Sequence, residues 1–101
     1  MKIFISQPMR GKTEKEILKE RDGAIERIEV LHPKETIEII DTYFKDFDGN
    51  RLQFLGKSIM KLAEADLAVF IGDYLNYDGC ACEYYIAKRY GIPIMEMPYK
   101  S

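Results

Sequence analysis

The stretch that most constrains the fold is residues 66–72, DLAVFIG, an almost uninterrupted apolar run. Such a run is typical of a strand inside a parallel sheet, where helices cover both faces. Parallel strands also need crossover connections, and the chain supplies them because strand-forming and helix-forming segments alternate along its length. The sequence therefore predicts an α/β domain with a small parallel sheet of four to five strands and right-handed crossovers.

The first half of the chain begins with a strand and a helix. Residues 2–6, KIFIS, predict a buried strand that ends at a Gln-Pro pair. Thr13 and Glu16 form a capping-box pattern, and apolar residues then recur with helical spacing, so we expect a helix over 13–31. Residues 36–44 are rich in Ile and Thr and predict a second strand.

The second half repeats this alternation. Asn50 is a predicted N-cap for a second helix, which ends before the apolar run. We expect a loop over 73–79 and a third helix over 80–90, stopped by Gly91 in the position after the C-cap. Residues 94–97 supply the last strand.

Composition restricts the class of function. A chain of 101 residues is long enough for one core, so residues 1–101 should form a single domain. The net charge of −2 and the lack of a Lys/Arg run argue against a nucleic acid polymer as partner. The N-terminus turns polar early and no segment could span a bilayer, so we expect a cytoplasmic protein without a membrane partner. Cys80 and Cys82 are one residue apart, which suits neither a disulfide nor a zinc site, and we expect reduced thiols, no metal and no cofactor.

Two loops leave strand ends, where open parallel sheets bind ligands. The first, residues 7–12 (QPMRGK), leads into a helix N-terminus, whose unpaired amides attract anions. Arg10 can clamp phosphate oxygens, and Gly11 allows close approach of the backbone. Because the loop lacks the Walker pattern, a phosphate site and a plain solvated loop both stay open.

Glu83 is the most unusual residue of the third predicted helix. It lies in the expected first turn, beside the apolar residues Ile86 and Ala87, where an unpaired carboxylate would be costly to bury. One interpretation is a capping glutamate that bonds to an amide near Gly79 or Cys80. The other is a nucleophile that faces a ligand cleft.

Three further polar residues are candidates for the same cleft. Ser58 falls on an inward stripe of the second helix, where it either bonds to the carbonyl one turn back or faces the site. Asp73 and Asp78 belong to the second loop. They are better placed than Asp66, which lies at the opposite strand end.

A family resemblance is carried by three segments, FISQPMRGK, LGKSIMKLAEADLAVFIGDY and DGCACEYYIAKRYGIPI, which cover most of the chain. Together they resemble the nucleoside 2-deoxyribosyltransferase-like superfamily, especially its short bacterial and phage-type members. The most specific part is a glycine-bearing turn, a glutamate at a helix start and the pattern A-x-x-x-G-x-P. The first loop is similar to the phosphate loop of the superfamily's nucleoside 5′-monophosphate N-glycosidases.

The resemblance implies a flavodoxin-like or Rossmann-like three-layer fold. It also implies that Glu83 attacks the anomeric carbon of a nucleoside or nucleotide and releases the base. Substrate contacts would fall to the strand ends and the two loops, at Ser6, Gln7, Pro8, Met9, Arg10, Gly11, Asp73, Gly79 and Cys80.

This chain departs from the superfamily at two positions. Relatives carry a tyrosine in the first strand and an aspartate in the second helix, where this chain has Phe4 and Ser58. Phe4 cannot hydrogen-bond to Glu83 or the sugar, and Ser58 cannot hold a negative charge, so either the chemistry is slow or other residues, such as Asp73 or Asp78, support Glu83.

Two other classes of function stay open. One is a non-catalytic protein that senses or sequesters a nucleotide in the same cleft, and the other is a purely structural oligomer subunit. We also expect a homodimer or a higher homo-oligomer, because so short a chain encloses a ligand poorly and the tyrosines of the third helix can pack against a partner.

Overall fold

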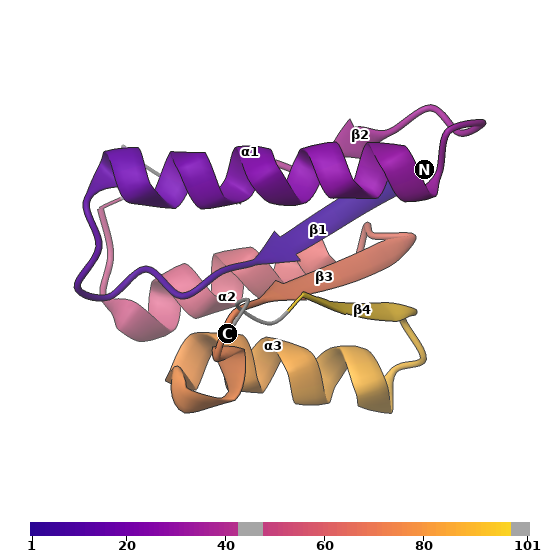
Figure 1. The fold of residues 1–101 in the computed structure, drawn as a ribbon. Coiled ribbons are helices and arrows are strands. Elements are labelled where there is room, and N and C mark those ends of the chain that lie inside the picture. Colours follow the sequence, from indigo (N-terminus) through magenta and orange to yellow (C-terminus); the bar gives the residue numbers. More distant parts are fainter. Residues whose placement is uncertain (43–47, 98–101) are drawn as a thin grey trace.

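A computed structural model describes residues 1–42 and 48–97 of the chain. Within these ranges, strands and α-helices alternate (Figure 1). They are β1 (Lys2–Ser6), α1 (Glu14–Leu31), β2 (Glu38–Ile39), α2 (Arg51–Leu62), β3 (Leu67–Ile71), the short 3-10 helix η1 (Tyr74–Asn76), α3 (Asp78–Arg89) and β4 (Ile94–Met97). None of the helices in this part of the chain is long and apolar enough to cross a membrane.

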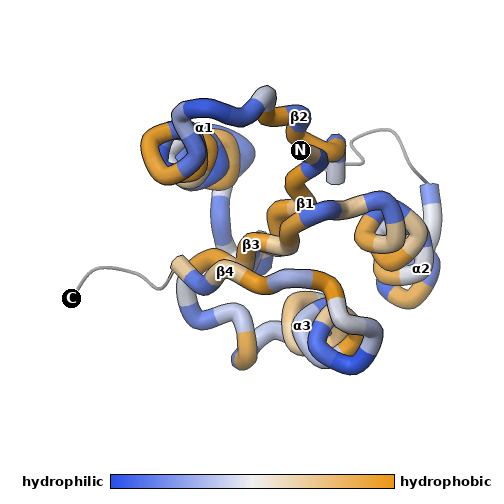
Figure 2. Tube along the Cα trace, turned by 90° about the vertical axis from the view of Figure 1, so that its right-hand side faces the viewer, coloured by the Kyte–Doolittle hydropathy of each residue, from blue (hydrophilic) through white to orange (hydrophobic). Residues whose placement is uncertain are grey.

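The strands form one parallel sheet in the order β2-β1-β3-β4. Strand β3, the predicted apolar run, lies inside the sheet between β1 and β4, and all of its residues are buried. Figure 2 shows α1 on one side of the sheet and α2 and α3 on the other. The predicted α/β class and the flavodoxin-like or Rossmann-like three-layer arrangement are confirmed.

Side chains of β1 alternate between the two faces of the sheet. Ile3 and Ile5 belong to the core beneath α1, where they pack with Ile28. Phe4 points to the opposite face and is fully buried in the core beneath α2 and α3. The same alternation turns Ser6, the last residue of β1, toward α2 and α3 at the carboxyl edge of the sheet.

The predicted helix boundaries depend on caps that are present in the structure. The Thr13 side chain accepts a hydrogen bond from the amide of Glu16, which closes a capping box with the amide of Thr13. Asn50 and Gln53 form the same reciprocal pair at the start of α2, at 2.8 and 2.9 Å. After α3, Gly91 takes a φ of +75°, a left-handed conformation that favours glycine and stops the helix.

The second strand is shorter than the predicted 36–44, since β2 comprises only Glu38–Ile39. The last two predicted residues lie outside the described residues. The amide of Ile40 still donates to the carbonyl of Ile3 at 2.9 Å, but the carbonyl of Ile40 accepts from Arg21 of α1 at 3.1 Å. The parallel ladder ends there because a side chain takes the carbonyl that the next strand bond would use.

The start of α3 also differs from the prediction. The loop expected over 73–79 contains η1, and α3 begins at Asp78, two residues before the predicted start. The ring of Tyr74 lies 5.3 Å from that of Phe70 and 5.2 Å from that of Tyr84, and this aromatic packing folds the segment back onto the sheet. Glu83 consequently lies in the second turn of α3, not the first.

Arg21 fixes the short edge strand to the rest of the fold. It is only 8% exposed, and its Nη1 donates to Oγ1 of Thr42 at 3.1 Å. The hydroxyl of Thr42 in turn donates to the carbonyl of Ile5 at 3.3 Å. Burial lowers the pKa of Arg21, while the negative charges of Asp41 and Asp22 act in the opposite direction. A buried cation therefore holds the segment after β2 against the end of β1.

Replacing this cation should loosen the fold. Arg21→Met keeps the aliphatic stem but leaves the Ile40 carbonyl and the Thr42 hydroxyl without their donor, so we expect a loss of about 1–3 kcal/mol in the free energy of unfolding. Urea denaturation would measure this loss. The matched control is Arg27→Met, an exposed position of the same helix, which should change stability by less than about 0.5 kcal/mol. Equal effects of the two variants would contradict this role of Arg21.

Candidate functional site

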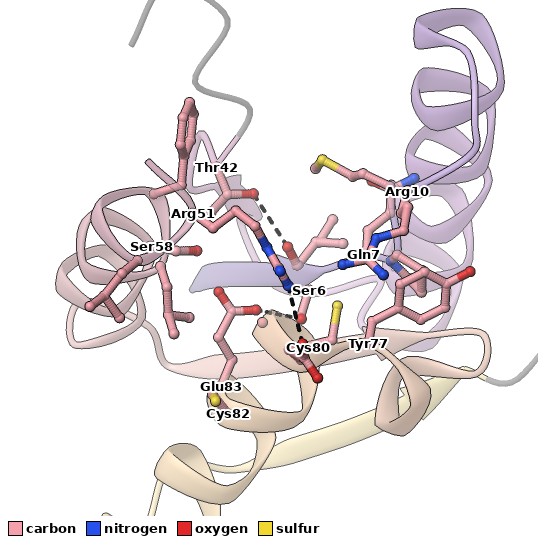
Figure 3. A pocket seen from close by; sticks show the side chains of 18 residues that line it. Ser6, Gln7, Arg10, Thr42, Arg51, Ser58, Tyr77, Cys80, Cys82 and Glu83 are labelled. Carbon is pink, nitrogen blue, oxygen red and sulfur yellow. Dashed lines mark hydrogen bonds and ion pairs between the residues drawn. The ribbon is translucent and has the colours of Figure 1, made fainter. Parts of the chain in front are cut away.

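A cavity of about 550 Å³ opens at the carboxyl edge of the sheet, between the loop after β1 and the first turns of α2 and α3 (Figure 3). This is the edge at which open parallel sheets bind ligands, and the volume lies within the range of small-molecule sites. Apolar side chains form much of the wall, namely Ile5, Pro8, Met9, Leu52, Phe54 and Leu55.

The cavity brings together most of the residues singled out in the sequence, namely Ser6, Gln7, Pro8, Met9, Arg10, Ser58, Asp78, Gly79, Cys80 and Glu83. Two other described candidates, Gly11 and Asp73, do not line it. Gly11 has a φ of +79° and shapes the turn in which the amide of Lys12 donates to the carbonyl of Met9. Asp73 precedes η1, and its negative charge contributes to the raised pKa of Cys80, which does line the cavity.

Glu83 is buried in the wall of this cavity, with 7% of its surface exposed. The hydroxyl of Ser6 donates to its Oε1 at 2.7 Å, across the boundary between β1 and α3. Helical spacing places Glu83 on the inward face of α3 with Cys80 and Ala87, the other buried residues of that helix. The capping interpretation is wrong, because Glu83 lies beyond the unpaired amides of the first turn and the N-cap has no side-chain hydrogen bond.

Burial raises the pKa of Glu83 above its ordinary value of 4.5. Hydrogen bonds from Ser58 and Ser6 oppose this shift, because they stabilise the ionised carboxylate. Figure 3 shows that the two serines come from different elements, Ser58 from α2 and Ser6 from β1. A carboxyl group whose charge is set by burial and by two hydroxyls in a cavity is typical of a functional site.

Cys80 is the second buried reactive group at the cavity. Burial raises the pKa of its thiol to about 11, and the charges of Glu83 and Asp73 add to the effect, while a hydrogen bond with Ser6 opposes it. The thiol is therefore protonated at neutral pH, and a protonated thiol is a poor nucleophile. Of these two side chains, Glu83 is the stronger candidate for a nucleophile.

Gln7 joins the cavity wall to α1. It is 5% exposed, and its Nε2 donates to the carbonyl of Ile17 at 2.6 Å. Its Oε1 is buried and has no hydrogen-bond partner within the described part of the chain. Because buried acceptors are usually paired, this oxygen is an unusual feature of the cavity wall.

The rim of the cavity carries charged groups of both signs. Arg10 is exposed on the loop after β1, and Arg51 of α2 pairs with Asp78 of α3, with 3.1 Å between Nη2 and Oδ2. Lys12, the other cation of the first loop, bonds to Glu20 of α1 at 2.8 Å. Arg10 and Arg51 are thus the cations that line the cavity among the described residues.

Several lining residues were not identified as site residues from the sequence, including Thr42, Arg51, Leu52 and Cys82. The predicted topology of the sheet could have indicated some of them. In a parallel sheet, each helix that follows a strand begins at the carboxyl edge, so the predicted cap at Asn50 already places the first turn of α2 beside the ligand site. The lining residues after Asn50 follow from that placement.

Comparisons with protein-family models, curated proteins and solved structures found no match to this chain.

Proposed function

We propose that this protein cleaves the N-glycosidic bond of a nucleoside or a nucleoside 5′-monophosphate, as an N-glycosidase or a deoxyribosyltransferase. The observation that carries the proposal is the carboxyl group of Glu83, buried in the wall of a ligand-sized cavity and bonded to Ser6 at 2.7 Å. The resemblance to the nucleoside 2-deoxyribosyltransferase-like superfamily assigns the nucleophile to the same residue.

The reaction requires an ionised Glu83. One carboxylate oxygen attacks the anomeric carbon, the bond from that carbon to the base nitrogen breaks, and its electron pair leaves with the base, which takes up a proton. The resulting glycosyl ester is then opened by water in hydrolysis or by a second base in transfer. Ser6 and Ser58 favour the ionised form of Glu83 through their hydroxyls.

The cavity offers separate surroundings for the parts of such a substrate. Apolar side chains such as Leu55 and Met9 suit the base, and Arg10 at the rim suits a 5′-phosphate. Phe4 does not line the cavity, so the tyrosine position of the superfamily contributes no hydroxyl here. Ser6, two residues along the same face of β1, supplies the hydrogen bond to Glu83 instead.

Loss of the nucleophile should abolish turnover. Glu83→Gln keeps the size of the side chain but removes the attacking oxygen anion, so release of free base should fall on the order of a thousandfold or more. Chromatography of nucleoside and nucleoside monophosphate reactions would measure the released base. Glu64→Gln, at an exposed glutamate that pairs with Lys61, is the matched control and should retain full activity. Undiminished release by Glu83→Gln would refute the assignment.

A second candidate function is nucleotide binding without catalysis. The observation that favours it is the thin polar surroundings of Glu83, because Phe4 has no hydroxyl and is buried away from the cavity, and Ser58 holds no negative charge. Calorimetry across a panel of nucleotides, followed by product analysis, separates the two functions. Binding with intact nucleotide after long incubation supports this candidate, and release of one base per protein or more excludes it.

The pH dependence follows from the same carboxyl group. Since burial raises the pKa of Glu83, base release should increase with pH, with a midpoint above 4.5. Ser6→Ala removes a hydroxyl that stabilises the carboxylate and should move the midpoint to higher pH. Rate measurements across pH would test both expectations, and a wild-type midpoint at or below 4.5 would contradict them.

Stability should change with pH in the opposite direction to activity. Between 4.5 and the raised pKa, the folded state holds a proton on Glu83 that the unfolded state has released, so this group makes the protein less stable as pH rises. Urea denaturation at several pH values should show this decrease in the wild type relative to Glu83→Gln.

We also propose that the protein is a homo-oligomer, with α2 in the interface. Leu62 is the one buried residue of this fully described helix, whereas Leu52 and Met60 are 75% and 73% exposed. Tyr85 and Tyr90 of the α3 region are also exposed, at 57% and 80%. Exposed apolar groups of this kind are typical of contact surfaces.

Light scattering would test this assembly. The wild type should have at least twice the mass of one chain, and Leu52→Glu with Met60→Glu should shift it to the mass of a single chain, because carboxylates would have to be buried in the interface. Val30→Glu is the matched control, since Val30 of α1 is equally exposed at 76% and lies on the other face of the sheet. A monomeric wild type at high concentration would rule the assembly out.

A further inference from the structure

Arg51 and Asp78 are the first residues of α2 and α3, and they meet across the mouth of the cavity. Their contact joins Nη2 of Arg51 to Oδ2 of Asp78 at 3.1 Å. Figure 3 shows the Arg51 side chain reaching into the cavity, with Ser6 and Glu83 nearby. Both partners of the ion pair thus line the same cavity as Glu83.

Breaking this ion pair costs little free energy, so a ligand can replace one of its partners. The two side chains are 74% and 84% exposed, and exposed pairs of this kind add little to stability. The contact uses one terminal nitrogen of Arg51 and one oxygen of Asp78. A guanidinium has five N–H donors and binds phosphate through two parallel hydrogen bonds, so a phosphate offers Arg51 a stronger contact than Asp78 does.

The two helix ends differ in electrostatic balance. Asp78 lies in the first turn of α3, where the helix dipole favours a negative charge. Arg51 lies in the first turn of α2, where the dipole disfavours a positive charge, and this turn, all of which is described, holds no acidic residue. An anion between Arg51 and the first turn of α2 would remove that imbalance, and Asp78 would stay stabilised by its own helix after losing the arginine.

We propose that Arg51 and Asp78 form an exchangeable clasp, which an anionic ligand opens by taking the guanidinium of Arg51 away from Asp78. Arg51 then adds to Arg10 in selecting phosphorylated over neutral ligands. The identity of the ligand, a nucleoside 5′-monophosphate, rests on the proposed function, whereas the exchange itself requires only a phosphate group.

The clasp makes a distinct prediction for each partner. Calorimetry with AMP and adenosine, on a Glu83→Gln background that prevents turnover, would measure both affinities. Arg51→Met should weaken binding of AMP by about 10-fold to 100-fold, as expected for a lost charge-assisted hydrogen bond, and leave adenosine within about twofold. Asp78→Asn should tighten AMP binding, by up to about fivefold, because it removes the competitor for Arg51. In the double variant Arg51→Met/Asp78→Asn, the tighter binding of AMP should be lost.

Two matched variants separate the clasp from a general effect of positive charge on phosphate binding. Lys61→Met removes a cation that lies at the far end of α2 and pairs with Glu64, and it should leave both affinities unchanged. Arg10→Met tests the other cation that lines the cavity. If Arg10→Met abolishes the preference for AMP and Arg51→Met does not, the clasp is wrong. Weaker AMP binding by Asp78→Asn would also overturn it.

A probe without a base keeps this test independent of the proposed function. Inorganic phosphate, titrated into the wild type, should shift the Nε–H resonance of Arg51 and the amide resonance of Asp78 in ¹H–¹⁵N spectra. The Asp78 shift should be lost in Arg51→Met. If these shifts occur but no nucleotide is cleaved, the glycosidase proposal fails and the clasp stands. If Arg51→Met changes neither the binding of phosphate nor the binding of AMP, the clasp proposal is wrong, whether or not the protein cleaves nucleotides.

Discussion

The hydrogen bond between Ser6 and Glu83 is the interaction on which the arrangement of the site depends. It links the last residue of β1 to the inward face of α3, at a distance of 2.7 Å between side chains of residues that are 2% and 7% exposed. The burial that makes Glu83 costly to ionise also strengthens the hydrogen bond that supports its charge. Cys80 interacts with both members of this pair, and Ser58 bonds to Glu83.

Much of the fold could be predicted from sequence because the relevant signals are local. The apolar run of β3, the capping boxes at Thr13 and Asn50, and the stop at Gly91 each depend on a few neighbouring residues. The errors arose where a distant side chain decided the outcome. Strand β2 ends early because Arg21, from a helix earlier in the chain, takes the carbonyl of Ile40. Likewise, η1 forms where Tyr74 joins aromatic rings contributed by β3 and α3.

The candidate site was predictable to a different extent at each element. Parallel topology places the strand ends together, so Ser6, the loop after it and Glu83 could be expected at one edge. The sequence did not reveal that Lys12 turns to Glu20, that Asp73 stays outside the cavity, or that Arg51 crosses to Asp78. Contacts between side chains that lie far apart in the sequence depend on the direction of each Cα–Cβ bond. A local sequence pattern does not determine that direction.

The uneven burial of α2 has a mechanical consequence. Its buried residue, Leu62, is at the C-terminal end, whereas Ser58 and Arg51 line the cavity toward the other end. The arm from Leu62 to Arg51 is about 16 Å long at 1.5 Å per residue. A tilt of roughly four degrees about Leu62 would therefore move Arg51 by about 1 Å, by simple trigonometry on that arm. The width of the cavity mouth is thus sensitive to small tilts of α2, and the ion pair of Arg51 with Asp78 opposes them at the far end of the helix.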